Sequence, residues 1–350
     1  MKSLAVLVFW LASVSPALLQ EANHGPGLTA TQSPLTMSQV LVWMDGGPES
    51  LRVAQLIERR GIDFSPTEDF LKQMAAMHAK PILLQKLKQA RVVHVAKDTV
   101  AEQSAFSDML ACVNGSNGAE DSCKKAAAIE PSTARFALGL KALHSGHADE
   151  ARSIFIDALV AEPGVADFQS YLGFALHKLH ELDLAESAYR KAMGLDPQFE
   201  TPVNNLASLF LDKNNPAQAE KFARQSVSLM PEDAWAHHNL GVALVKQSQV
   251  HEGIQELSEA ERLEPENPFH HTQMGEIFEI GKKYEFALAE YRQAADLDPR
   301  NVEVHKKILA MLLLLHQPEQ AITECEKLQA LMNQHPKESC KEFVRRTLRK

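Results

Sequence analysis

The stretch that decides the fold is residues 167–197, DFQSYLGFALHKLHELDLAESAYRKAMGLDP. Its first part carries apolar side chains at helical spacing, which predicts a helix with one apolar stripe. That stripe consists of Phe168, Tyr171, Leu172, Ala175, Leu176 and Leu179. A polar turn follows, and a second stripe comprises Leu184, Ala185, Ala188, Tyr189 and Ala192. Asp196-Pro197 ends the second helix because proline cannot continue it. Such a helix pair cannot bury its apolar stripes alone.

The same residue classes recur every 34 residues between Ser132 and Leu328. The prolines are Pro163, Pro197, Pro231, Pro265 and Pro299. Small residues recur in phase at Gly139, Gly173, Ala207, Gly241 and Gly275, and large apolar residues at Phe155, Tyr189, Leu257 and Tyr291. Small residues suit places where two helix backbones come closest, and the large ones fill the gaps between them. One period that carries several residue classes indicates a stacked repeat array.

This pattern resembles the tetratricopeptide repeat family, with five clear repeats and a sixth that begins near Arg300. The usual aromatic near each repeat start is replaced by other residues, and Ala223 leaves the third repeat underfilled. The resemblance implies an all-α fold, a right-handed superhelix of stacked antiparallel helix pairs. It also implies a protein-interaction scaffold that presents a concave groove to a peptide or partner protein, with the first helix of each pair lining the groove.

Some members of the family carry amide side chains two residues before the small residue. Here that position is Asn205, Asn239 and Gln273 in three consecutive repeats. An amide both donates and accepts, so a row of amides could hydrogen-bond an extended peptide backbone. Trp235 and His238, on the same first helix as Asn239, would add a pocket wall. The alternative is that these amides only hydrogen-bond the neighbouring helix.

The N-terminal residues predict an exported protein. Residues 1–17 have a positive start, a short apolar core and small residues before a cleavage point, as in a secretory signal peptide. The apolar run is too short for a spanning helix, which needs about 20 residues, and no cysteine follows it for lipid attachment. We expect no membrane span in the mature chain. Residues 18–34, rich in glycine and proline, predict a linker.

Residues 35–90 predict a small helical domain of four helices. The string Ser65-Pro66-Thr67-Glu68 resembles a capping box, which predicts a helix start at Ser65. Residues 91–131 predict a connector and a degenerate first repeat, and residues 132–332 the repeat array. Residues 333–350 predict a capping helix with a polar outer face.

The charge and the motifs exclude several functions. A net charge of −9 leaves no broad basic face for nucleic acid. No hydrolase, phosphate-loop or metalloprotease motif is present. We therefore expect neither an enzyme nor a bound cofactor. The alternative is an enzyme or metal-binding envelope protein that uses the N-terminal module or the histidine-rich turns.

Two groups of histidines are candidate metal ligands. His237, His271 and His305 share one repeat position and should stand roughly 10 Å apart, too far for one ion, which predicts half-buried packing residues. His144 with His147, and His177 with His180, lie three residues apart near acidic side chains, a spacing that suits zinc. Exposed turns collect polar residues for solvation alone, so no metal site is expected.

The four cysteines fit an exported chain. Sequence proximity favours the pairs Cys112–Cys123 and Cys325–Cys340 among three possible pairings. Strict repeat geometry opposes the first pair, but a longer glycine-rich loop between its helices would permit it.

Overall fold

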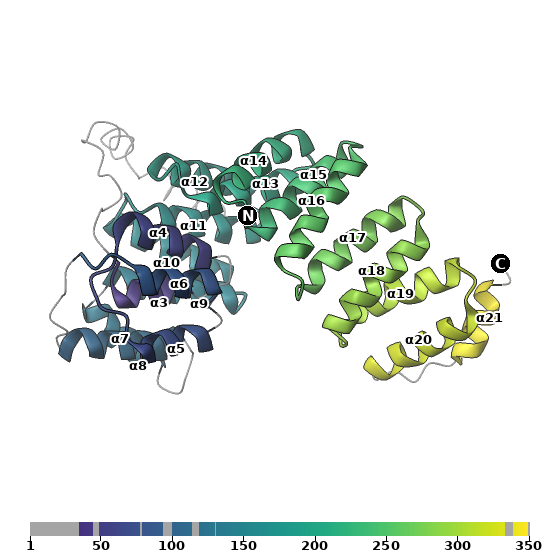
Figure 1. Ribbon diagram of the computed structural model, residues 1–350, viewed down its shortest axis with the longest axis horizontal. Coiled ribbons are helices and arrows are strands. Elements are labelled where there is room, and N and C mark those ends of the chain that lie inside the picture. The colour runs from purple at the N-terminus through teal and green to yellow at the C-terminus, as the bar shows by residue number, and fades with distance from the viewer. Residues whose placement is uncertain are drawn as a thin grey trace, which may run out of the picture. The chain divides into compact units, whose positions relative to one another are not determined.

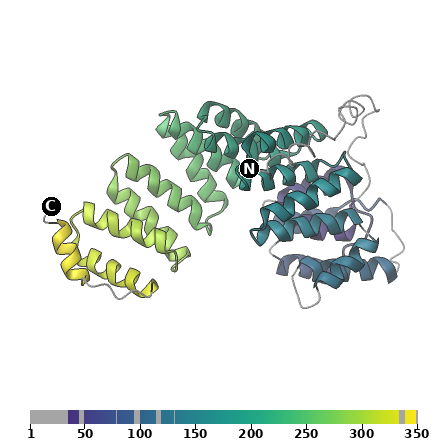
Figure 2. The same cartoon turned by 180° about the vertical axis from the view of Figure 1, so that it is seen from behind.

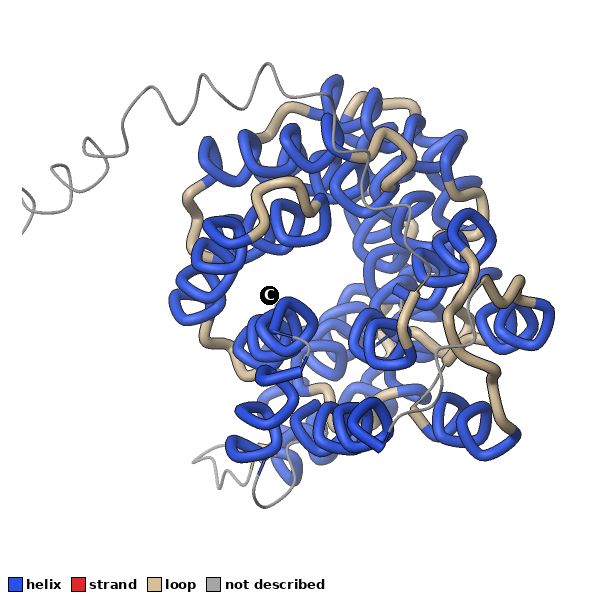
Figure 3. The backbone as a smooth tube through the Cα atoms, turned by 90° about the vertical axis from the view of Figure 1, so that its left-hand side faces the viewer, coloured by secondary structure: helices blue, strands red, loops and turns tan. Residues whose placement is uncertain are grey.

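The computed structural model describes residues 35–44, 49–77, 79–93, 100–113, 119–129, 131–332 and 339–348. These residues form an all-α fold of paired helices, as the sequence predicts, and Figure 3 shows helices and loops but no strand among them. The predicted signal peptide, the linker and the loop at 114–118 lie outside the described residues. No described helix has the length and apolar character that crossing a membrane requires.

The chain divides into two compact units, one ending at Phe199 and the other beginning at Glu200. Each unit is built from helix pairs whose members run side by side (Figures 1 and 2). The division falls inside the predicted repeat array, between its second and third repeats. The units are described separately below.

Unit 1 carries the N-terminal helices, the degenerate repeat and two regular repeats. Its helices are α3 (Met37–Met44), α4 (Glu49–Arg60), α5 (Glu68–Ala76), α6 (Pro81–Gln89), α7 (Val100–Val113), α8 (Ala119–Ile129), α9 (Pro131–His144), α10 (Ala148–Ala161), α11 (Ala166–Lys178) and α12 (Leu182–Leu195). The pairs α7/α8, α9/α10 and α11/α12 are successive repeats, each with a first and a second helix.

Unit 2 carries four further pairs and a closing helix. Its helices are α13 (Glu200–Asp212), α14 (Pro216–Leu229), α15 (Ala234–Lys246), α16 (Val250–Leu263), α17 (Pro268–Ile280), α18 (Tyr284–Leu297), α19 (Val302–Leu314), α20 (Pro318–Leu331) and α21 (Cys340–Leu348). Helix α21 packs on α19 and α20 and buries Val344 there. It occupies the place where the sequence predicts a cap.

The small residues sit where the sequence predicts them, at the closest approach of two helices. A methyl group added to Gly173 would lie 2.6 Å from the ring of Tyr189, and one on Gly275 2.5 Å from the ring of Tyr291. The third repeat has Ala207 instead of glycine. It is not left underfilled beside Ala223, because Phe222 is buried and stacks on Phe210 at 5.5 Å.

The turn inside each of the six repeats from α9/α10 to α19/α20 has one residue in the left-handed region, again every 34 residues. These residues are Gly146, His180, Asn214, Ser248, Lys282 and His316. At Lys282 the backbone N–H bonds the carbonyl of Glu279, and the next N–H bonds that of Phe278. This is the Schellman ending of a helix, which favours glycine at the left-handed position. Only Gly146 supplies glycine there.

The N-terminal module, α3 to α6, differs from the sequence expectation in two ways. Helix α5 begins at Glu68 with Thr67 as its N-cap, whose hydroxyl accepts from the Phe70 N–H, so the predicted start at Ser65 is two residues early. The physical reason is that Ser65 and Pro66 belong to the preceding loop. Leu35, Ile62 and Val92 also form isolated parallel bridges, which helical periodicity could not reveal.

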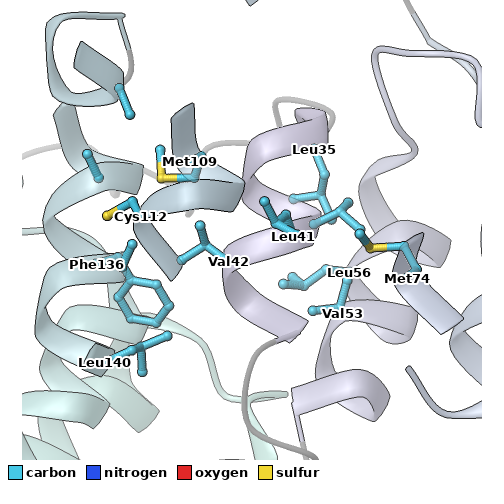
Figure 4. Close-up of a cluster of buried hydrophobic side chains, with 14 of the residues drawn as sticks. Leu35, Leu41, Val42, Val53, Leu56, Met74, Met109, Cys112, Phe136 and Leu140 are labelled. Atoms are coloured by element: carbon cyan, nitrogen blue, oxygen red, sulfur yellow. The ribbon is translucent and has the colours of Figure 1, made fainter. Parts of the chain in front are cut away.

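The module shares one core with the repeats of unit 1. A continuous cluster of buried side chains runs from Leu35 to Ala175. Figure 4 shows Val42 of α3 beside Met109 of α7 and Phe136 of α9. The helical domain predicted at residues 35–90 therefore has no separate core.

Both predicted cysteine pairs are disulfides in the structure. Cys112 and Cys123 have Cα atoms 4.9 Å apart, and Cys325 and Cys340 5.7 Å apart. Helix α8 begins at Ala119, so Cys123 lies about one turn inside it instead of at its start. The second disulfide ties α21 to α20.

Candidate first-helix binding face

The candidate site is the surface formed by residues two, three and six positions before the small residue of each first helix, called here the first-helix face. In unit 1 it contains Thr133, Phe136, Ala137, Asp167, Ser170 and Tyr171. In unit 2 it contains Thr201, Asn204, Asn205, Trp235, His238, Asn239, Phe269, Thr272 and Gln273. All five residues predicted to bind a peptide fall on the unit 2 face.

In unit 1 most of this face is covered, and Tyr171 is its half-buried member. Thr133, Phe136, Asp167 and Ser170 are each at most 6% exposed. Helix α3 packs directly against the first helices α7 and α9. The N-terminal module thus occupies the surface that the repeats would otherwise present.

A buried arginine fastens α4 of the module to the same repeats. Arg52 is 2% exposed, and its Nη2 donates to Asp196 Oδ2 at 2.9 Å. Its guanidinium lies 3.9 Å above the centre of the Phe199 ring, and its Nε is 3.8 Å from Asp167 Oδ1. Burial alone would raise the pKa of Asp196, but the charges of Arg52 and Arg59 outweigh burial and lower it. The module therefore docks through charge as well as apolar contact.

In unit 2 the same face carries a group of four aromatic rings from α15 and α17, called here the Trp235 cluster. Trp235 lies 5.1 Å from Phe269 and 5.7 Å from His238, measured between ring centroids. His270 completes the cluster, 5.4 Å from Trp235. Phe269 is 39% exposed and Trp235 half-buried, whereas His238 and His270 are buried. Two buried histidines therefore support two partly exposed rings.

One of the two buried histidines, His238, carries no charge near pH 7. His238 Nδ1 and His270 Nδ1 are 3.4 Å apart, so one ring can donate to the other. Burial, helped by His270, lowers the pKa of His238 to about 3. His238 is thus neutral near pH 7, and the outer rings of Trp235 and Phe269 form an apolar surface.

The three amides of the predicted row differ in their hydrogen-bond partners. Asn239 is 7% exposed and donates to Asn204 Oδ1 at 2.7 Å on the neighbouring first helix. Gln273 donates to Glu276 at 3.1 Å on its own helix. Asn205 is half-buried and has no hydrogen-bond partner among the described residues. For Asn239 this bond to the neighbouring helix agrees with the alternative to peptide binding given in the sequence analysis.

Sequence reasoning missed Phe269, His270 and Asn204. A signal for Phe269 existed, because it stands 34 residues after Trp235 and so shares its repeat position. No such signal marked His270, whose role depends on contact between α15 and α17. The peptide-binding role of the five predicted residues stays a prediction.

Comparison with known proteins identifies the repeat. Residues 136–198 match the family model described as tetratricopeptide repeat. This segment is therefore similar to tetratricopeptide repeats. No curated protein sequence matches the chain.

Two solved structures with TM-scores above 0.5 share the fold. The crystal structure of the APC/C hetero-tetramer Cut9–Hcn1 has a TM-score of 0.59 and 18% identity, covering 87% of this chain and 56% of that one. The protein thus spans just over half the length of that relative. PilF of Pseudomonas aeruginosa has a TM-score of 0.51 and 20% identity, covering 62% of this chain and 97% of its own. At such identities the likeness shows the tetratricopeptide fold alone.

The histidines that replace the usual tetratricopeptide aromatic each meet a glutamate on the second helix of their repeat. His237 Nδ1 lies 2.7 Å from Glu256, and His271 Nδ1 lies 3.0 Å from Glu290. His305 pairs with Glu324 in the same way. The bond to Glu256 raises the pKa of His237, although burial opposes it. His271 is half-buried as predicted, whereas His237 and His305 are buried, and each of the three rings contacts a glutamate carboxylate.

The histidine-rich turns lie in unit 1, in the repeats α9/α10 and α11/α12. His144 and His147 line an open surface pocket of about 780 Å³ with Asp149 and Lys178. His180 is the left-handed residue of its turn. In the described part of the chain, only Glu261, His271 and Glu290 bring three potential metal ligands together.

Proposed function

We propose that the protein is an exported adaptor that binds a peptide or partner protein on the first-helix face of unit 2. The observation that carries this proposal is the contrast between the two units. The module covers the face in unit 1, whereas Trp235 and Phe269 remain partly exposed in unit 2. A tetratricopeptide array is a common scaffold for protein contacts, and the related Cut9–Hcn1 structure is itself a hetero-tetramer.

The chemistry of the face suggests its ligand. Exposed aromatic rings in contact with one another suit an apolar or aromatic side chain, because aromatic residues dominate binding hot spots. Asn205 on the neighbouring first helix α13 and Gln273 on α17 can bond a peptide backbone beside the Trp235 cluster. The ligand we propose is an extended segment with one apolar anchor residue.

Export is supported by two features of the chain. Residues 1–17 have the composition of a signal peptide. The two disulfides suit an oxidising compartment, because cytosolic thiols are kept reduced. We propose a periplasmic or secreted location.

The test is selection of peptides from a displayed random library with the full disulfide-bonded chain. Affinity of the best peptides is then measured by fluorescence anisotropy. Phe269→Ala should weaken binding at least tenfold, and so should the pair Asn205→Ala with Gln273→Ala. Asn239 is left intact because its bond to Asn204 is structural.

Phe286→Ala is the matched control. Phe286 is 61% exposed but lies on α18, a second helix, outside the first-helix face. Its removal should leave affinity unchanged. Equal losses of peptide affinity for Phe269→Ala and Phe286→Ala would contradict a binding site on this face. So would a selection that enriches no peptide.

A further inference from the structure

We propose that Glu261, His271 and Glu290 form a binding site for one divalent transition-metal ion, for which Zn²⁺ is the probe. Glu261 lies in the last turn of α16, His271 in the first turns of α17, and Glu290 in the middle of α18. An ion held by all three would link two consecutive repeats of unit 2. The site is separate from the first-helix face.

The spacing of the donor atoms matches the spacing around a metal ion. His271 Nδ1 lies 3.0 Å from Glu290 Oε2 and 3.4 Å from Glu261 Oε1. The three donor atoms all lie within 4.8 Å of one another. Nitrogen and oxygen ligands about 2.1 Å from zinc stand about 3.0–3.4 Å apart in adjacent positions. Small side-chain adjustments would therefore suffice to close the site.

One of these atoms lacks any other partner. Oε1 of Glu261 is buried and accepts no hydrogen bond from any residue that the structure describes. A buried carboxylate oxygen without a partner is costly, and a cation is one group that can satisfy it. The three side chains are 17–24% exposed, so an ion could reach them and keep water in its remaining positions.

The repeat itself provides an internal comparison. His237 and His305 have their own glutamates, but their Nε2 atoms meet the carbonyls of Pro231 and Pro299. The position equivalent to Glu261 is Val227 one repeat earlier and Ala295 one repeat later. A histidine with one glutamate is thus the general packing arrangement. The third ligand is present in this repeat alone among the three.

The donor set selects the class of ion. An imidazole suits zinc, copper, iron and nickel, whereas carboxylates alone suit magnesium and calcium. One imidazole with two carboxylates therefore favours a borderline divalent ion such as Zn²⁺ over Mg²⁺. All four cysteines are in disulfides, so no thiol competes for it.

The experiment is isothermal titration of the chelator-treated full chain, with both disulfides intact, using Zn²⁺ and then Mg²⁺. The wild type should bind one Zn²⁺ at this site far more tightly than Mg²⁺. Glu261→Val, which installs the residue found one repeat earlier, should weaken Zn²⁺ binding at least tenfold. Glu256→Gln alters the His237 pair, which lacks a third ligand, and should leave Zn²⁺ affinity unchanged.

A second measurement covers the case in which Glu261→Val does not fold. Paramagnetic Mn²⁺ added to the wild type should broaden the imidazole NMR signals of His271 and leave those of His237 sharp. Three results would each overturn the proposal. The first is the absence of Zn²⁺ binding by the wild type. The second is Zn²⁺ binding that Glu261→Val does not weaken, and the third is Mn²⁺ broadening centred on the exposed turn of His144 and His147.

Discussion

At the scale of single residues, the repeat depends on glycines that have a packing role. Gly173 of α11 faces Tyr189 so closely that a methyl group would meet the ring at 2.6 Å. Tyr189 is fully buried and has little room to move. Gly173→Ala should therefore lower the free energy of unfolding by about 1–3 kcal/mol through overpacking, measured by chemical denaturation.

Gly194 supplies the control, since it is also a helical glycine, in α12, but has no atom within 4 Å of an added methyl. Gly194→Ala should stabilise the protein by up to about 1 kcal/mol through helix propensity. If both alanines stabilise the protein, the effect at position 173 comes from helix propensity and not from the contact with Tyr189.

At the scale of elements, the turn between the two helices of a repeat keeps its left-handed backbone conformation even where the residue type changes. Five non-glycine residues hold φ between 51° and 66° there. A side chain in that region costs about 1–2 kcal/mol. Lys282 is exposed at such a position. Lys282→Gly should raise the free energy of unfolding by about 0.5–1 kcal/mol, since glycine's extra freedom in the unfolded chain offsets part of the gain.

The reverse change tests the same argument. Gly146 has φ of 77° and no atom within 4 Å of an added methyl, so only its backbone conformation matters. Gly146→Ala should lower the melting temperature. A melting temperature that Lys282→Gly lowers would mean that the Lys282 side chain has a stabilising contact of its own.

At the scale of the molecule, the N-terminal module is part of unit 1 and not an appendage to it. Arg52→Leu would leave Asp167 and Asp196 buried without their shared cation. Breaking such a buried pair typically costs about 3–5 kcal/mol. We expect Arg52→Leu to lower the free energy of unfolding of unit 1 by this amount, measured with denaturant. Proteolysis between residues 35 and 131 should also increase.

Arg59 also contacts Asp196, at 3.3 Å, but its side chain is 43% exposed. Arg59→Leu should therefore cost no more than about 1 kcal/mol, the range of solvent-screened pairs. If Arg52→Leu and Arg59→Leu lower the free energy of unfolding by similar amounts, Arg52 has no special part in docking the module.

The sequence by itself determined the features that repeat. The period of 34 defined the helix pairs, the small residues at their closest approach and the large residues facing them. These features are predictable because each repeat contacts mainly its neighbours, so local spacing specifies the packing. Sequence proximity also favoured both disulfides, whose cysteines are 11 and 15 residues apart, although regular repeat geometry opposed the first.

Only the tertiary structure decided what depends on contacts between distant or non-equivalent elements. The bond from Arg52 to Asp196 spans 144 residues, and no periodic pattern relates the two. Through it α4 of the module is held against the repeats of unit 1. The bond of Asn239 to Asn204 and the meeting of Glu261 with His271 and Glu290 depend on side-chain directions across adjacent helices. Sequence spacing gives the face of a helix on which a residue lies, but packing alone decides which neighbour that residue meets.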